Sequence, residues 1–285
     1  MSYIRKIWIS GANGRLGQEL VRFLDPMDAE ILATDKEEVD ITDAEAVMNF
    51  AERFRPQIII NCAGMTDPEA CEKAPETAFL VNGLGARNMA IAAQRIQAKM
   101  VQLSTDDVFD GDVERKAFRE FDTPNPSTMY GKSKLFGEQY TRDFCNRYFI
   151  LRSSWLYGTA EDRVEHILSQ ARNNGQVLVA KEQYACPTSA RQLARFIAYL
   201  IQTNEYGTYH AVCTGIASRA DFARAVLQRA GLDVPVEERE EVFNAVYRPD
   251  YSVLENFLLR VGNLYEFPTW EEDLTDYMKE VYGDR

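Results

Sequence analysis

The chain has 285 residues, of which 46% are hydrophobic, and a formal net charge of −12. This length and apolar content suffice for one large domain or two lobes with a sizeable core. The acidic balance argues against a nucleic-acid partner or an anionic membrane surface, because both require a basic face.

The first half of the chain alternates short apolar segments with amphipathic ones. We predict strands at 6–10, 30–35, 57–64, 100–105 and 148–155, and helices at 15–24, 43–54, 78–95 and 130–146. Strands that alternate with helices favour a parallel sheet covered on both faces, with right-handed crossovers. The predicted fold class is therefore α/β, with a doubly wound parallel Rossmann sheet.

Beyond Trp155 the alternation loosens, which indicates a second, smaller unit. The elements predicted there are a strand, a loop and a helix within 175–202, a short strand at 208–213, and helices at 218–231 and 269–283. Ser218 and Gly231 are residue types that commonly begin and end a helix. We expect a Rossmann domain over 1–155 and a mainly substrate-binding lobe over 156–285, with some segments returning to the first domain.

Three glycines directly follow the first predicted strand and open the first predicted helix, in the stretch GANGRLG. Such glycines permit a tight turn, close approach of the backbone to a pyrophosphate, and close helix–strand packing. The helix N-terminus then presents free N–H groups to the phosphates. This context predicts a dinucleotide-binding turn whose contact residues are Gly11, Asn13, Gly14, Arg15 and Leu16.

Further cofactor contacts are expected where the next strands end. Asp35 closes the second strand, where a carboxylate bonds the adenosine ribose hydroxyls and repels a 2′-phosphate. The adjacent Lys36 could bind that phosphate, so the cofactor is either NADH or NADPH. The other expected contacts, for which a plain packing role stays open, are Asp40, Ile41, Cys62, Ala63 and Gly64.

Tyr130 and Lys134 lie four residues apart at the start of a predicted helix, so they share one helical face. A tyrosine with an ordinary pKa of about 10 exchanges protons poorly at neutral pH. A nearby ammonium, together with the positive charge of an oxidised nicotinamide, would lower the pKa of Tyr130. The pair predicts proton exchange between Tyr130 and a substrate oxygen while the cofactor transfers a hydride.

A series of motifs that spans nearly the whole chain resembles the dTDP-4-dehydrorhamnose reductase family of extended short-chain dehydrogenase/reductases. The motifs are GANGRLGQEL, DITD, NCAGMTDPEACE, STDDVFDG, YGKSK, RSSWLYG, EQYACPT and RPDYSVLEN. The resemblance implies a catalytic set in which Thr105 bonds the substrate carbonyl, Tyr130 protonates it, and Lys134 tunes Tyr130 and binds the nicotinamide ribose. It also implies that Asn82 is the family's helix asparagine and that Ser252 belongs to its substrate-lobe motif. The substrate contacts that it implies are Thr66, Trp155 and Arg248. For Trp155, packing is the alternative.

The chain departs from that family's pattern on the substrate side. After Ser-Thr-Asp the family usually has tyrosine, whereas this chain has Asp107, and Met65 replaces a second aromatic. We expect Asp107 to face the substrate, where a carboxylate about 6 Å from a phosphate in solvent costs only about 1 kcal/mol. The reaction implied is NAD(P)H-dependent reduction of a 4-keto nucleotide sugar, with dTDP-4-dehydrorhamnose to dTDP-rhamnose as the leading case.

Two other functions stay open. A nucleotide-sugar epimerase or dehydratase would have the same fold, and Asp106-Asp107 could be mistaken for the extra acid/base pair of a dehydratase. A non-catalytic NAD(P)-binding regulatory subunit, such as the related beta subunit of methionine adenosyltransferase, belongs to another class. The intact Thr105, Tyr130 and Lys134 argue against a pure scaffold.

The remaining composition indicates a cytoplasmic, reduced protein without a metal. We see no signal peptide and no apolar run near the roughly 20 residues that span a bilayer. The five cysteines are scattered without a CxxC pair, so we expect buried thiols. His166 is interpreted as an ordinary helix residue, Glu19 as a solvated helix residue, and the LSTDDVFDGD stretch lacks the ligand spacing of a calcium loop. A homodimer is left open.

Overall fold

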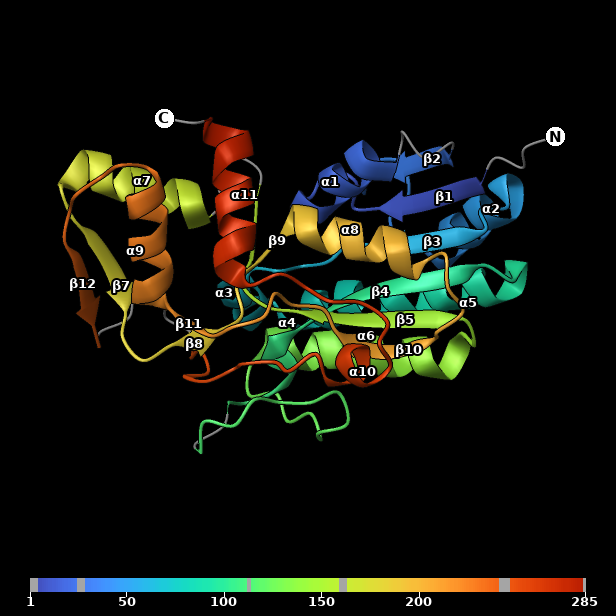
Figure 1. The fold of residues 1–285 in the computed structure, drawn as a ribbon. Helices are drawn as coiled ribbons and strands as arrows, with labels where there is room; N and C mark the ends of the chain where they lie inside the picture. The colour runs from blue at the N-terminus through green and yellow to red at the C-terminus, as the bar shows by residue number, and fades with distance from the viewer. Residues whose placement is uncertain (1–4, 25–28, 112–113, 159–162, 241–246, 284–285) are drawn as a thin grey trace.

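The structure, a computed structural model, describes residues 5–24, 29–111, 114–158, 163–240 and 247–283. Its centre is a six-stranded sheet in the order β10-β5-β4-β3-β1-β2, in which every neighbouring pair is parallel (Figure 1). The strands are β1 (Arg5–Ser10), β2 (Ala29–Thr34), β3 (Ile58–Asn61), β4 (Lys99–Thr105), β5 (Tyr148–Ser153) and β10 (Gly207–His210). The predicted doubly wound α/β fold is confirmed.

Both faces of the sheet are buried at its centre, which explains why the central strand β3 is a run of isoleucines, whereas the edge strand β2 is partly exposed. Successive side chains point to opposite faces. Ile7 and Ile9 of β1 pack in one core with α1 and α8, whereas Trp8 packs in another with α2 and α5. The covering helices are α1 (Arg15–Leu24), α2 (Ala44–Phe54), α5 (Ala86–Ile96), α6 (Met129–Phe144) and α8 (Ala190–Leu200).

The sheet has its topological switch point between β1 and β3, because β1 pairs with β2 on one side and with β3 on the other. Doubly wound proteins bind ligands at the carboxyl ends of the strands at such a point. Gly11 follows β1 there with φ +68°, and a Cβ on it would lie 2.6 Å from the backbone nitrogen of Ala63. Only glycine fits this turn without strain.

The long helix predicted at 78–95 is interrupted by a π-helical turn at Phe79–Gly85. Asn82 lies in this turn, accepts a hydrogen bond from Met65 N at 2.9 Å, and donates to Met65 O and Ser133 Oγ, each at 2.9 Å. Its amide thus ties the loop after β3 to α6. π-turns often occur where a side chain must be aimed at a functional site.

The chain after residue 155 divides between the sheet and a smaller lobe. β10 extends the sheet and α8 covers it, while the elements of the smaller lobe lie at the left of Figure 1. That lobe contains α7 (Arg163–Asn174), β7 (Val177–Ala180), α9 (Arg219–Arg229) and β12 (Val236–Arg239), with β12 parallel to β7. Ser218 caps α9 as predicted, and Gly231 follows its end with a left-handed φ. The domain boundary at residue 155 stays a prediction.

The remaining elements connect these layers. They are α3 (Pro68–Lys73), α4 (Pro75–Ala78), the 3-10 turn η3 (Asp106–Val108), β6 (Leu156–Tyr157), β8 (Tyr184–Ala185), β9 (Thr188–Ser189), β11 (Ala217–Ser218), α10 (Phe257–Val261) and α11 (Trp270–Tyr282).

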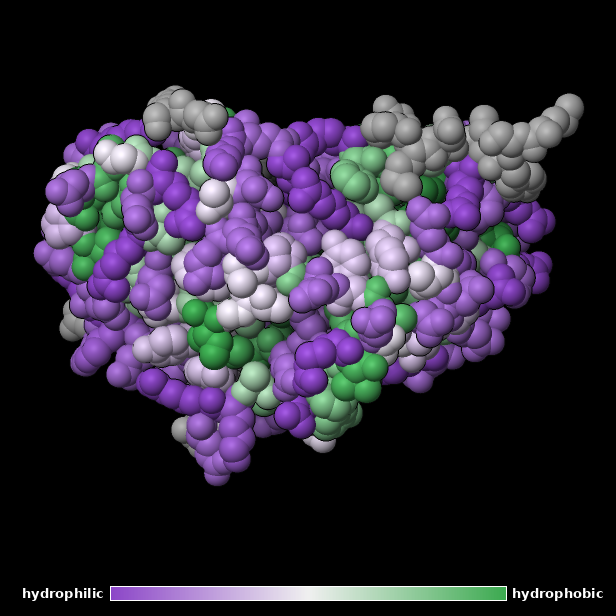
Figure 2. All heavy atoms as spheres, in the orientation of Figure 1, coloured by the Kyte–Doolittle hydropathy of each residue, from purple (hydrophilic) through white to green (hydrophobic). Residues whose placement is uncertain are grey.

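The described residues contain no helix that is both long and apolar enough to cross a membrane. Figure 2 shows a mainly hydrophilic face, on which hydrophobic residues form separate patches. All five cysteines are free and four are buried, as expected for structural thiols. Within the same residues, no group of three or more His, Cys, Asp or Glu side chains is placed to hold a metal ion.

Candidate functional site

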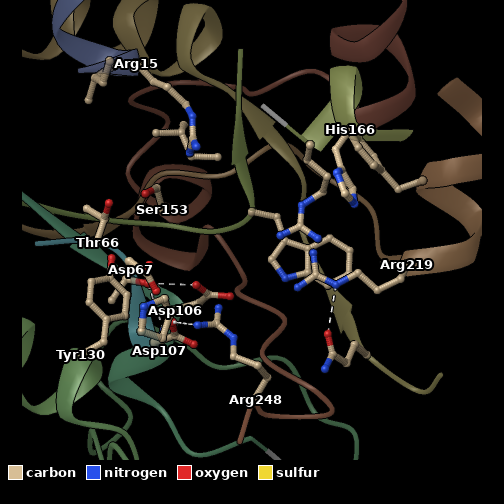
Figure 3. A pocket seen from close by; sticks show the side chains of 18 of the residues that line it. Arg15, Thr66, Asp67, Asp106, Asp107, Tyr130, Ser153, His166, Arg219 and Arg248 are labelled. Carbon is tan, nitrogen blue, oxygen red and sulfur yellow. Dashed lines mark hydrogen bonds and ion pairs between the residues drawn. The ribbon is translucent and has the colours of Figure 1, made fainter. Parts of the chain in front are cut away.

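A cavity of about 1060 Å³ lies at the carboxyl ends of the central strands, between the sheet and the smaller lobe (Figure 3). Most of the predicted site residues line it: Gly14, Arg15, Leu16, Cys62, Gly64, Thr66, Thr105, Asp107, Tyr130, Lys134, Trp155 and Arg248. Eight other predicted residues are not among those that line it: Gly11, Asn13, Asp35, Asp40, Ile41, Ala63, Asn82 and Ser252.

Thr105 ends β4 close enough to the phenol of Tyr130 for its side chain to lower the pKa of Tyr130. Its Oγ1 also accepts from Asp107 N at 3.2 Å and donates to Asp106 Oδ1 at 3.1 Å. Tyr130 is placed by α6, which begins at Thr128, whose side chain accepts from Gly131 N. Two hydroxyls therefore converge at the end of β4.

Asp106 is a buried carboxylate that joins three segments of the chain. Besides Thr105, it accepts hydrogen bonds from Ser154 Oγ at 2.8 Å and Ser252 Oγ at 2.7 Å, both at Oδ2. Both of its oxygens are thus occupied by protein donors. Asp107 next to it forms an ion pair with Arg248, at 3.0 Å. This arrangement does not resemble a free acid/base pair of a dehydratase.

The pKa of Tyr130 is raised, first by burial and then by the carboxylate of Asp107. The Thr105 side chain and the charge of Arg248 lower the pKa of Tyr130 but do not outweigh these two effects. Among the protein groups, desolvation of the phenolate therefore exceeds the nearby positive charge. The lowering expected from the sequence includes the charge of an oxidised nicotinamide, and for that complex it stays a prediction. Tyr130 keeps its proton at neutral pH, which is the form that a proton donor needs.

Lys134 is buried one helical turn after Tyr130, and burial lowers its pKa to about 8. Of the groups that raise the pKa again, the carboxylate of Glu138 has the largest effect. A Cβ on Gly64 would lie 3.8 Å from Lys134 Nζ, so the ammonium approaches the loop after β3. Lys134 thus extends from α6 toward the loop where the cofactor is expected.

Trp155 follows β5 with a φ of +39°, and two arginines lie over its ring. Arg219 Cζ is 3.4 Å from the ring centre and Arg163 Cζ is 5.5 Å from it. Arg219 comes from the start of α9 and Arg163 from the start of α7, so the smaller lobe meets the sheet at this ring. The ring is both packed against protein and exposed to the cavity.

The family model described as "RmlD substrate binding domain" matches residues 5–282. The dTDP-4-dehydrorhamnose reductase of Streptomyces griseus is 33% identical to this chain, over 99% of it and 96% of the relative. The chain belongs to the dTDP-4-dehydrorhamnose reductase family. The spore coat polysaccharide biosynthesis protein SpsK of Bacillus subtilis is 34% identical over 96% of this chain and 97% of its own length.

A solved structure of this family has nearly the same fold. It is the dTDP-4-dehydrorhamnose reductase of Bacillus anthracis in complex with NADP, which is 37% identical, with a TM-score of 0.95 over 98% of this chain and 100% of that one. The Rossmann fold expected from the resemblance is therefore confirmed for this member of the reductase family.

At the end of the site where the adenosine is expected, the Asp35 carboxylate accepts hydrogen bonds from backbone N–H groups. Asp35 Oδ2 accepts from Asn13 N at 3.1 Å and Oδ1 accepts from Lys36 N at 2.9 Å, so the end of β2 is tied to the glycine turn. Asp40 accepts from Thr42, which lowers the pKa of Asp40. Ile41 is buried, and its side chain lies in the space that a Cβ on Gly85 would occupy. As cofactor contacts, these residues stay predictions.

The residues that line the cavity of this reductase-family protein without having been expected from the sequence include Arg163, His166, Gln183 and Arg219. His166, interpreted as an ordinary helix residue, lies on α7 on the side that faces the cavity (Figure 3), and its functional role is untested. Arg219 follows a helix N-cap, a position at which a solvated side chain is common. No local pattern distinguishes these residues from surface ones.

Proposed function

We propose that this protein reduces the 4-keto group of a dTDP-linked 4-keto-6-deoxy sugar, with NADPH or NADH as reductant and dTDP-4-dehydrorhamnose as the first substrate to test. The observation that carries the proposal is the convergence of the Thr105 and Tyr130 hydroxyls at the end of β4, beside the glycine turn. Membership of the reductase family supports the same substrate class.

The residues at the switch point fit a nicotinamide dinucleotide. The turn at Gly11 leaves no room for a Cβ, and Gly14, Arg15 and Leu16 open α1 where its N–H groups can bind a pyrophosphate. Asp35 at the end of β2 would hold the adenosine ribose, and Lys134 the nicotinamide ribose. When bound, the reduced cofactor supplies the hydride.

Tyr130 supplies the proton in this proposal. Its raised pKa keeps the phenol protonated until negative charge develops on the keto oxygen, which then is the stronger base. The Thr105 hydroxyl would orient the carbonyl by turning its single proton from Asp106 Oδ1 to the same keto oxygen, while Asp107 N continues to donate to Oγ1. Donors fixed in a largely dry site stabilise the developing charge without reorganisation.

Oxidation of NADH and NADPH by the purified protein, measured across a panel of 4-keto nucleotide sugars, tests this function. We expect stoichiometric cofactor oxidation with dTDP-4-dehydrorhamnose and formation of the 4-hydroxy sugar, seen by mass spectrometry. Product without net cofactor oxidation would identify an epimerase or dehydratase instead. Failure on every sugar, with a synthetase that co-purifies, would support the regulatory-subunit alternative.

The homodimer and the cytoplasmic location stay proposals. Light scattering of the purified protein distinguishes a monomer from a homodimer, and fractionation of the native cells locates it.

A further inference from the structure

Arg219 has a buried guanidinium group that is incompletely bonded. The residue is 9% exposed, and its Nε donates to Gln183 Oε1 at 3.0 Å. Its Nη1 is buried and has no hydrogen-bond partner among the described residues. Buried donors of a charged group are nearly always paired, so a bound anion is the expected partner.

The carboxylates near Arg219 are committed to other groups. Both oxygens of Asp106 accept from hydroxyl groups, and Asp107 is paired with Arg248. Burial and the positive charges of Arg163 and Arg248 lower the pKa of Arg219, more than Asp106 and Asp107 raise it. Among the described residues, no carboxylate therefore forms an ion pair with the Arg219 guanidinium.

We propose that Arg219, held over the ring of Trp155, forms the subsite that binds the diphosphate of the nucleotide-sugar substrate. A planar guanidinium matches two phosphate oxygens at once, and stacking on an aromatic ring fixes its orientation. The inference rests on the proposed function and specifies how its substrate is held.

The position of Arg219 suits the diphosphate rather than the reacting carbon. In Figure 3, Arg219 and Tyr130 lie on opposite sides of the cavity, with Arg248 between them in this view. A sugar whose keto oxygen meets Tyr130 therefore extends its diphosphate toward Arg219. Arg248 is already bonded to Asp107, and among the described residues that line this cavity Arg219 is the guanidinium with a buried donor that has no partner.

Calorimetric titration of dTDP into the protein with bound NADPH tests the subsite. For Arg219→Gln we expect the affinity for dTDP to fall roughly 10- to 100-fold, as for loss of a hydrogen bond between charged groups. Arg219→Lys keeps the charge but not the planar fork, so an intermediate loss is expected. The matched control is Arg224→Gln, on the same helix, where the arginine is exposed and paired with Asp221 and Glu238; its affinity should not change.

A purely structural role for Arg219 predicts a different result. In that case the substitutions would lower the melting temperature but would not reduce the affinity for dTDP more than the affinity for an uncharged ligand. The melting temperature of each variant and its affinity for uncharged thymidine are therefore measured as well. Affinity for dTDP that is unchanged in Arg219→Lys and Arg219→Gln, or that falls no more than the affinity for thymidine, overturns the subsite. Binding of dTDP needs no turnover, so the two proposals can fail separately. If the protein binds dTDP through Arg219 but reduces no keto sugar, the proposed reaction is wrong and the proposed diphosphate subsite stands.

Discussion

Arg248 Nη1 lies 3.0 Å from Asp107 Oδ2, so the residue that replaces the tyrosine usual in this family is half of an ion pair. The Asp107 side chain is 3% exposed and that of Arg248 is 18% exposed, which makes the pair largely buried. From the sequence, the carboxylate of Asp107 was expected to face the substrate and to repel its diphosphate. The partner arginine compensates that charge, so the repulsion expected from the sequence is mostly offset.

Asp107 makes stability depend on pH in a direction opposite to that of most carboxyl groups. Burial, and then the charge of Asp106, raise the pKa of Asp107 to about 6, against about 3.9 in an unfolded chain. Between these values the folded protein holds a proton that the unfolded chain has lost. The free energy of unfolding should therefore fall as pH rises from about 4 to about 6, by up to about 3 kcal/mol from this residue.

Asp107→Asn should remove this component of the pH dependence. Urea unfolding of the wild type and the variant across that range measures it, with the exposed Asp143→Asn as the control. Equal pH slopes for wild type and Asp107→Asn would contradict the raised pKa.

Tyr130→Phe should lower kcat by about 10²- to 10⁴-fold, the usual effect of losing a positioned proton donor, while affinity for NADPH stays near that of the wild type. Steady-state turnover and cofactor titration measure the two quantities. Tyr140→Phe, on the same helix but outside the residues that line the cavity, should change neither. Turnover that survives in Tyr130→Phe would exclude this tyrosine as the donor.

Lys134 should make cofactor binding sensitive to alkaline pH. Its pKa is lowered to about 8 by burial, so the folded, cofactor-free protein loses this charge as pH rises through 8. NADPH affinity should decline above that pH in the wild type, and Lys134→Met should bind weakly with no such decline. The variant also removes a group that is destabilising when charged, since a buried ammonium favours the unfolded state below about pH 8. A wild-type affinity that is constant across this range would refute the assignment.

Gly11→Ala should prevent normal packing of the glycine turn. The added Cβ would lie 2.6 Å from Ala63 N in addition to the strain of a positive φ, and we expect a loss of about 3 kcal/mol or more, with weakened cofactor binding. Gly175→Ala has a similar φ of +65° and nothing within 4 Å of its Cβ, so it should cost only about 1 kcal/mol. Thermal and urea unfolding compare the two. Similar losses would show that φ strain, and not the approach of the backbone after β3, makes glycine necessary at residue 11.

Asp35→Ser should shift the cofactor preference toward NADPH. The change removes a carboxylate that would repel a 2′-phosphate and leaves Lys36 beside it, so the ratio of kcat/KM for NADPH to that for NADH should rise about tenfold. The same ratio in Glu37→Ser, an exposed neighbour, serves as the control. An unchanged ratio in Asp35→Ser would place the ribose end of the cofactor elsewhere.

The sequence by itself determined the fold class and the central part of the candidate site. Buried parallel strands, amphipathic helices, the glycine turn and the spacing of Tyr130 and Lys134 depend on interactions within a few residues, and these are legible in the order of amino acids. The capping of α9 by Ser218 could be predicted for the same reason.

Only the tertiary structure decided which charged groups meet in the site and which segments of the chain enclose it. The cavity is formed where the end of β4, the start of α6, the start of α9 and the segment around Arg248 meet, and these are far apart in the chain. The raised pKa of Tyr130, the pairing of Asp107 and the stacking of Arg219 on Trp155 follow from that meeting. Desolvation and charge–charge interactions depend on distance in space, so no local pattern could have indicated them.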